Sequence, residues 1–228
     1  MFFLTYQYVN ANDKTNIFNT DFSVDFMSMH TWRGYATSYS PTIEPTLEFS
    51  TPNAKAGIWA AQSLDGNYTE IDLYFTQRYK NISFSIFDYY CPPSYKNTNE
   101  ITDYTKHKTK HTIELALEYS NLFKSHFNFM ITTMVYGDDL DSETKQNRYS
   151  TYFQFSYSTS IDKNTLDLVL GFNTFDNSYY ANSFSIVNAG IKAKRNLKLF
   201  KSKEIPLQAS VITNPINESL FLKFGFSL

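Results

Sequence analysis

The sequence predicts an all-β fold, a transmembrane, antiparallel, up-and-down β-barrel of about twelve strands. Apolar side chains recur at every second position through stretches of about ten residues, which is the period of a strand with two different faces. Aromatic residues make up 18% of the chain, with 21 Phe and 18 Tyr, while the mean hydropathy is only -0.38. No apolar run reaches the roughly 18 residues that a spanning helix needs, so a closed barrel is the remaining way to cross a bilayer.

Charge and cysteine content narrow the classes of function. The net charge of -2 and the pI near 6.1 give no basic excess, so nothing favours nucleic acid as a partner. The single cysteine, Cys91, excludes an internal disulfide and a metal cage built on several cysteines. We expect residues 20–228 to form one barrel, and residues 1–19 to be the remnant of a signal peptide or a flexible N-terminal tail.

The first six predicted strands cover residues 21–26, 42–49, 55–62, 70–79, 82–90 and 113–119. Their apolar faces carry Phe22, Val24 and Phe26; Ile43, Leu47 and Phe49; Ala56, Ile58 and Ala60; Ile71, Leu73, Phe75 and Tyr79; and, in the sixth, Ile113, Leu115, Leu117 and Tyr119. The third strand has the weakest alternation. The fifth carries apolar residues on both faces, so its register stays open.

The last six predicted strands cover residues 126–135, 148–157, 166–173, 183–195, 207–213 and 219–228. Their apolar faces carry Phe127, Phe129, Ile131 and Val135; Tyr149, Phe153, Phe155 and Tyr157; Leu166, Leu168, Leu170 and Phe172; Val187, Ala189, Ile191 and Ala193; and, in the twelfth, Leu220, Leu222, Phe224, Phe226 and Leu228. A soluble β-sandwich would produce much of the same alternation.

The connections favour the barrel over the sandwich. Alternate connections are long, as at residues 32–41, 91–110 and 137–147, and the others are mostly short, as at residues 80–81. Bacterial barrels have this asymmetry, with tight periplasmic turns and longer outer loops. The segment 196–204 is an exception, because it is long and rich in lysine on the predicted periplasmic side.

Aromatic residues crowd the ends of the predicted strands. Amphipathic rings belong at the boundary between lipid headgroups and acyl chains, so they predict an aromatic girdle, although strand propensity alone would also place them there. The girdle residues are Trp32, Tyr35, Tyr79, Tyr89, Tyr136, Tyr149 and Tyr179.

Two sets of motifs resemble known bacterial proteins. The last predicted strand, with Leu222, Phe224, Phe226 and Leu228, is similar to the C-terminal assembly signal of outer-membrane proteins, although in those the terminal residue is usually aromatic. The segments Met29-His30-Thr31-Trp32-Arg33-Gly34 and Pro41-Thr42-Ile43-Glu44-Pro45, with shorter motifs such as Glu70-Ile71-Asp72-Leu73-Tyr74, resemble the TorF-like family of porins. The resemblance implies a barrel and a porin role. For a barrel in the bacterial outer membrane, we expect lipid, lipopolysaccharide and the barrel-assembly machinery as partners.

The polar faces of the strands carry charges that must point inward, because a charge on the lipid side costs about 2–4 kcal/mol at the midplane. The predicted pore-lining residues are Asp25, Glu44, Glu48, Lys55, Glu70, Asp72, Arg78, Glu114, Glu118, Arg148, Lys192 and Lys223. Most acids precede most bases in the chain, so we expect a transverse field across a channel for small hydrophilic solutes or ions. Alternatively, these groups pair and plug a closed barrel that acts through its outer loops.

An outer-membrane hydrolase is the third hypothesis. The histidines are His30, His107, His111 and His126, and no serine stands in a recognisable nucleophile motif, so we expect no catalysis. His107 and His111 lie among lysines that indicate a solvated loop, and residues 137–143 lack the full spacing of a calcium loop. We therefore expect no metal and no cofactor.

Overall fold

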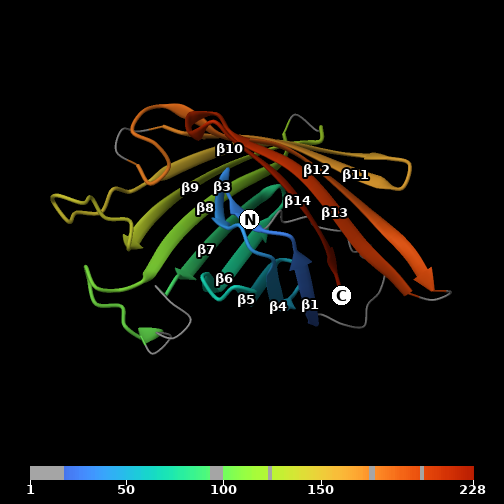
Figure 1. Cartoon of the computed structure of the whole chain (residues 1–228), viewed down its shortest axis with the longest axis horizontal. Helices are drawn as coiled ribbons and strands as arrows, with labels where there is room; N and C mark the ends of the chain where they lie inside the picture. Colours follow the sequence, from blue (N-terminus) through green and yellow to red (C-terminus); the bar gives the residue numbers. More distant parts are fainter. Residues whose placement is uncertain (1–17, 93–99, 123–124, 175–177, 201–202) are drawn as a thin grey trace.

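The structure is a computed structural model that describes residues 18–92, 100–122, 125–174, 178–200 and 203–228. Within these residues, twelve antiparallel strands pair side by side and close into one barrel, in the order β1-β14-β13-β12-β11-β10-β9-β8-β7-β6-β5-β4 (Figure 1). The wall strands are β1 (Asn19–Met27), β4 (Thr42–Ser50), β5 (Ala54–Ser63), β6 (Thr69–Tyr79), β7 (Ile82–Tyr90), β8 (His111–Leu122), β9 (Phe127–Gly137), β10 (Thr151–Ile161), β11 (Asn164–Asn173), β12 (Ser185–Phe200), β13 (Lys203–Asn214) and β14 (Ser219–Ser227). The predicted fold class is confirmed, and each predicted strand coincides with one strand of the wall. The prediction for residues 1–19 falls almost entirely on residues 1–17, outside the described residues.

The two faces of the wall differ as the alternation predicts. Large apolar side chains stay exposed on the outer face, among them Phe22, Ile58, Leu73, Phe84, Leu117, Phe155, Leu168, Val211 and Leu222. Side chains of the opposite parity are buried inside and are largely polar, such as Asp72, Thr76, Ser85, Glu114 and Asp167. A soluble protein rarely exposes so continuous an apolar surface, whereas the hydrocarbon core of a bilayer stabilises it. This outer face excludes the soluble sandwich.

The barrel closes at a short seam. β1 pairs with β4 along its whole length but with β14 only through Asp25–Met27. Backbone hydrogen bonds extend the seam in both directions, between Val24 and Leu228 at 3.0 and 3.1 Å and from the Ser28 amide to the Phe224 carbonyl at 2.8 Å. The rings of Phe26 and Phe226 stack over it with centroids 5.0 Å apart.

The connections between strands alternate in length. Residues 91–110 and 138–150 join strands at one end, while residues 80–81 and 162–163 join them at the other. The 3₁₀ turn η2 (Pro215–Asn217) links β13 to β14. No helix in the described part of the chain is long and apolar enough to cross a membrane.

The segment 196–204, predicted as a long loop, is mostly strand. β12 continues to Phe200 and β13 begins at Lys203, with Asn196 paired to Pro206 and Lys198 to Glu204. Pairing satisfies backbone groups that a loop would leave to water. The Lys198 ammonium also lies 3.5 Å from a Glu204 carboxylate oxygen in this ribbon.

The segment predicted as the first long outer loop contains a hairpin that folds into the barrel. β2 (His30–Trp32) and β3 (Tyr35–Ser38) pair with each other and form a sheet separate from the wall. The hairpin turns at Arg33 and Gly34, with φ angles of 47° and 85°. A Cβ at position 34 would lie 1.9 Å from the Val187 carbonyl oxygen, so this close approach to β12 requires glycine.

A β-bulge changes the predicted face of Val187. The pairing of β11 with β12 shifts between Gly171 and Phe172, so that Asn188 opposes Gly171 and Ile186 opposes Phe172. The extra residue, Val187, is fully buried instead of lipid-facing, while Ile186 is exposed. A bulge inserts one residue without a partner and so breaks the period of two.

Substitution of Leu73 by arginine tests lipid contact. Leu73 stands near the middle of β6 on the exposed apolar face, where arginine should lower the free energy of unfolding by about 2–4 kcal/mol. The measurement is denaturant unfolding from lipid vesicles. Gln77→Arg is the matched control, since Gln77 lies on the same face near the strand end and should cost about 0–1 kcal/mol. Equal losses for the two variants would contradict lipid contact at Leu73.

Candidate functional site

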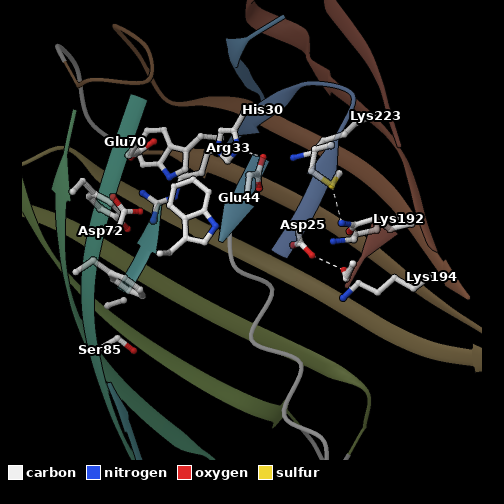
Figure 2. Close-up of a pocket in the computed structure, with 18 of the residues that line it drawn as sticks. Asp25, His30, Arg33, Glu44, Glu70, Asp72, Ser85, Lys192, Lys194 and Lys223 are labelled. Atoms are coloured by element: carbon white, nitrogen blue, oxygen red, sulfur yellow. Dashed lines mark hydrogen bonds and ion pairs between the residues drawn. The ribbon is translucent and has the colours of Figure 1, made fainter. Parts of the chain in front are cut away.

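The candidate site is a charged cavity of about 270 Å³ inside the barrel. Strands of the wall and the inner hairpin both line it. Figure 2 shows Glu70 and Asp72 on one side of the cavity and Lys192, Lys194 and Lys223 on the other. Glu70 and Asp72 belong to β6, and Lys192 and Lys194 belong to β12. Five strands separate β6 from β12 in either direction round the barrel. The two walls therefore face each other with opposite charge.

The acidic wall is centred on Asp72 in β6. Its register partners are Trp59 in β5 and Tyr89 in β7, and all three side chains line the cavity. Asp72 is 5% exposed, and its Oδ1 has no hydrogen-bond partner among the described residues. Glu70, two positions away, accepts a short hydrogen bond from the Tyr68 hydroxyl. Glu118 lines the cavity from β8.

The basic wall is centred on β13. Ser210 is the register partner of Lys192 in β12 and of Lys223 in β14, which places a hydroxyl between two lysines on the inner face. Asp167 is opposite Lys192 and almost fully buried. Asp25 lies nearer the cavity and accepts a hydrogen bond from the Ser227 hydroxyl.

Arg33 holds the tip of the hairpin against the far wall. Its guanidinium donates two hydrogen bonds to the Glu114 carboxylate, at 2.6 and 2.7 Å, and a third to the Tyr180 hydroxyl. The Arg33 Cζ lies 4.6 Å from the ring centroids of both Trp32 and Tyr152. Tyr89 also donates to Glu114 at 2.8 Å. Carboxylate and aromatic rings together offset the cost of burying this charge.

His30 holds the base of the hairpin. Its Nδ1 lies 2.9 Å from Glu44 Oε1, which also accepts a hydrogen bond from the Thr42 hydroxyl at 2.6 Å. The imidazole packs between Trp59 and Tyr68, with centroid distances of 5.2 and 5.4 Å. The hairpin is thus anchored to β4 at its base and to β8 at its tip.

The structure places the predicted pore-lining residues in three groups. Those that line the cavity are Asp25, Glu44, Glu70, Asp72, Glu118, Lys192 and Lys223. In the second group the charges are paired with other side chains. Glu114 points inward, but its carboxylate is hydrogen-bonded to Arg33. Glu48 and Lys55 form an ion pair at 3.0 Å.

The third group consists of two arginines outside the cavity. Arg78 donates a hydrogen bond to the Lys80 carbonyl at 3.0 Å, at the end of β6. Arg148 lies in the connection before β10, because that strand begins at Thr151 and not at the predicted residue 148.

The predicted girdle residues divide between the outer surface and the interior. Tyr79, Tyr149 and Tyr179 are exposed, and Tyr136 donates to the Tyr104 carbonyl at 2.5 Å. Three others depart from the girdle prediction. Trp32 and Tyr35 lie on the inner hairpin, and Tyr89 lines the cavity. Their apolar rings pack around Arg33 and Tyr180 instead of meeting lipid.

The predicted outer loops use their polar groups to hold themselves together. His111 Nδ1 lies 2.7 Å from Asp88 Oδ1, and its Nε2 lies 2.9 Å from the Ile101 carbonyl oxygen. Tyr104 donates to Asp88 at 2.5 Å, and burial together with this hydrogen bond raises the pKa of Tyr104 to about 12. Asp139 accepts from the amide and hydroxyl of Ser150 at 2.8 and 2.6 Å. Among the described residues, no three His, Cys, Asp or Glu side chains gather in a way that could hold a metal ion.

Sequence reasoning gave Arg33, Tyr152 and Tyr180 no role inside the lumen. The three meet from segments as far as 147 residues apart, at a hairpin that the sequence marks only as a long connection. The signal that could have indicated it is Trp32-Arg33-Gly34, because a glycine-containing turn between two short aromatic segments is typical of a hairpin.

The fold and the lumen together define the class of protein: a lipid-facing β-barrel whose interior holds a charged cavity crossed by a hairpin. No known family profile matches the chain, and no curated protein matches it either.

Two solved structures follow a similar path through space. One comes from a study of the in-meso crystallization of membrane proteins, with 8% identity, a TM-score of 0.45, and coverage of 92% of this chain and 82% of that one. The other is an outer membrane channel from Pseudomonas putida F1, with 11% identity, a TM-score of 0.40, and coverage of 91% and 93%. Likenesses at this level carry no information on function.

Substitution of Glu114 by glutamine tests the anchor of the hairpin. Glutamine keeps the shape of the side chain but leaves the Arg33 charge buried without its counter-ion, so docking of the hairpin should weaken by about 3–5 kcal/mol. Hydrogen exchange of the β2 and β3 amides measures this loss. Glu48→Gln, which removes the charge of a more exposed ion pair, should cost about 0–1 kcal/mol. Unchanged protection of the hairpin in Glu114→Gln would contradict the anchor.

Proposed function

We propose that this barrel is an outer-membrane channel for passive movement of small hydrophilic solutes or ions, narrowed by the hairpin β2–β3. The observation that carries the proposal is the cavity inside a closed wall, with acids on one side and lysines on the other. Charged groups that line an interior need water or counter-charges, and water is the medium through which hydrophilic solutes move.

The hairpin sets the width of this path. A barrel of about twelve strands is intermediate between small barrels filled by their own side chains and open porins. The hairpin lies across the lumen, and its tip contacts β8 through Arg33 and approaches β12 through Gly34. Solutes would therefore pass beside the hairpin and between charged walls, where the transverse field orients them and biases ion passage.

The membrane assignment rests on the outer face. Its exposed apolar side chains fit the acyl core of an outer membrane, and lipid and lipopolysaccharide are the surroundings that this location supplies. The residues of the predicted assembly signal, Leu222, Phe224, Phe226 and Leu228, all lie exposed on this face, where barrel-assembly machinery would meet them. The resemblance of residues 29–34 and 41–45 to the TorF-like porins supports the same assignment.

A closed barrel that acts through its outer loops is the second candidate. The buried contacts of Arg33 favour it, because a docked hairpin blocks much of the lumen. We propose no catalytic role. His30 is already engaged by Glu44 and enclosed by two rings, an arrangement that fits an anchor. Ester hydrolysis by the purified barrel that is lost in His30→Ala would contradict this view.

Single-channel conductance of Gly34→Ala tests the channel and its constriction together. A Cβ at position 34 would lie 1.9 Å from the Val187 carbonyl oxygen, and the φ of +85° there is strained for alanine. The hairpin must therefore leave the wall, and the conductance should rise severalfold. Gly190→Ala is the matched control on β12, since its Cβ lies 3.1 Å from the Val211 carbonyl oxygen and a small shift relieves the contact. It should conduct like the unmodified protein.

Absence of current from the unmodified protein, Gly34→Ala and Gly190→Ala, each as a folded, heat-modifiable barrel, would overturn the proposal. A closed lumen would then move the search for function to the outer loops. Equal currents from the three proteins would keep the channel and remove the hairpin as its constriction.

A further inference from the structure

Asp72 presents an unsatisfied acceptor to the cavity. Its carboxylate is 5% exposed, and within the described residues its Oδ1 accepts no hydrogen bond. A buried carboxylate oxygen without a donor is costly, and native structures rarely leave one without a reason. Glu70 lies two positions away on the same inner face and also lines the cavity, so two acidic side chains share this part of the wall.

Aromatic rings flank Asp72 on both sides. Trp59 and Tyr89 are its direct register partners, and side chains opposite each other on one face have Cβ atoms about 4.5–5.5 Å apart. Trp32 of the hairpin packs edge-on against Tyr89, with centroids 6.2 Å apart. Rings beside a carboxylate are the environment in which proteins hold an organic ammonium.

The opposite wall has the complementary arrangement. Lys192 and Lys223 flank Ser210 in register, and Lys194 also lines the cavity. Two ammonium groups and a hydroxyl can donate several hydrogen bonds to one carboxylate. Three acids lie near these lysines: Asp25 lines the cavity, Asp167 is the register partner of Lys192, and Glu44 lies close to Lys223 but is already hydrogen-bonded to His30 and Thr42.

We infer that the cavity binds small zwitterions, with a primary ammonium at Asp72 and a carboxylate at Lys192 and Lys223. The inference rests on the proposed channel and names the class of solute that the channel takes. A solute with one charge is attracted to one wall only. A zwitterion satisfies both walls at once, and its net charge of zero leaves the charge of the lumen unchanged.

The ammonium must carry N–H groups. The open position at Asp72 is an acceptor, and a quaternary ammonium has no hydrogen to donate. The part of the cavity at Asp72 therefore distinguishes a primary ammonium from its trimethylated counterpart, although both are cations and both can lie against Trp59. This difference separates recognition by Asp72 from attraction by the rings alone.

Calorimetric titration of the full chain, folded in detergent micelles, tests the inference. The probes are ω-amino carboxylates of increasing length, with butylammonium and butanoate as single-charge controls and the N,N,N-trimethyl form of the best zwitterion. The best zwitterion should bind at least about tenfold more tightly than either single ion, because each end gains charge-assisted hydrogen bonds. The trimethyl form should bind at least about tenfold more weakly than its parent.

Three variants assign the two ends. Asp72→Asn should weaken the zwitterion and butylammonium by about tenfold or more and leave butanoate unchanged. Lys223→Gln should weaken the zwitterion and butanoate and leave butylammonium unchanged. Ser85→Ala is the control, since Ser85 lines the cavity without charge and bonds to Thr76 at 2.8 Å; it should bind every probe normally. Heat-modifiability confirms that each variant is a folded barrel.

Two results would overturn the inference: a zwitterion that binds no better than butylammonium, or an affinity for the primary ammonium that Asp72→Asn does not change. The same barrels measured in potassium chloride separate this failure from failure of the channel. Current without zwitterion binding would keep the channel and remove this solute class. Zwitterion binding in a barrel that carries no current would keep the site and remove the channel.

Discussion

Closure of the backbone is the constraint on which the rest of this structure depends. A bilayer offers no hydrogen bonds to an open strand edge, so the first and last strands of the wall must pair. Here the pairing of β1 with β14 is short, and bonds of Val24 and Ser28 to β14 extend it. Once the sheet is closed, every strand has a lipid face and an interior face. The side chains of the wall do not fill an interior of this size, and the hairpin β2–β3 occupies part of the remaining space.

Burying an arginine in that interior is costly, and the surroundings of Arg33 explain how the fold tolerates it. Bidentate contact with Glu114 supplies the counter-charge, Tyr180 accepts a further hydrogen bond, and the rings of Trp32 and Tyr152 cover the guanidinium. Such a pair contributes little net stability compared with apolar packing, but losing one partner is severe. Its main effect is to fix position. Together with His30 on Glu44, it holds both ends of the hairpin and so sets the shape of the cavity.

The wall was predictable from sequence, and the contents of the lumen were not. Alternation such as Ile71, Leu73 and Phe75 against Glu70 and Asp72 follows from the pleat and depends on no distant residue. The buried position of Val187 was not predicted, because a bulge adds one residue and inverts the alternation of faces. No local signal marks where a bulge occurs. The positions of Trp32 and Arg33 inside the lumen were not predicted, because a long connection can fold outward or inward. The inward fold depends on Glu114, 81 residues away from Arg33. The acids and lysines of the cavity were found because their faces follow from alternation alone.

The opposition of charges across the lumen follows from the topology. In an up-and-down barrel, consecutive strands are neighbours, so distance along the chain becomes an angle around the axis. The acids Glu70, Asp72 and Glu118 on β6 and β8 and the lysines on β12 and β14 therefore occupy different sectors, and β6 lies diametrically opposite β12. No long-range contact is needed to separate the charges, because the order of the strands does it. The hairpin β2–β3 then occupies part of the space between the two sectors, and His30, Trp32 and Arg33 join both walls in lining one cavity.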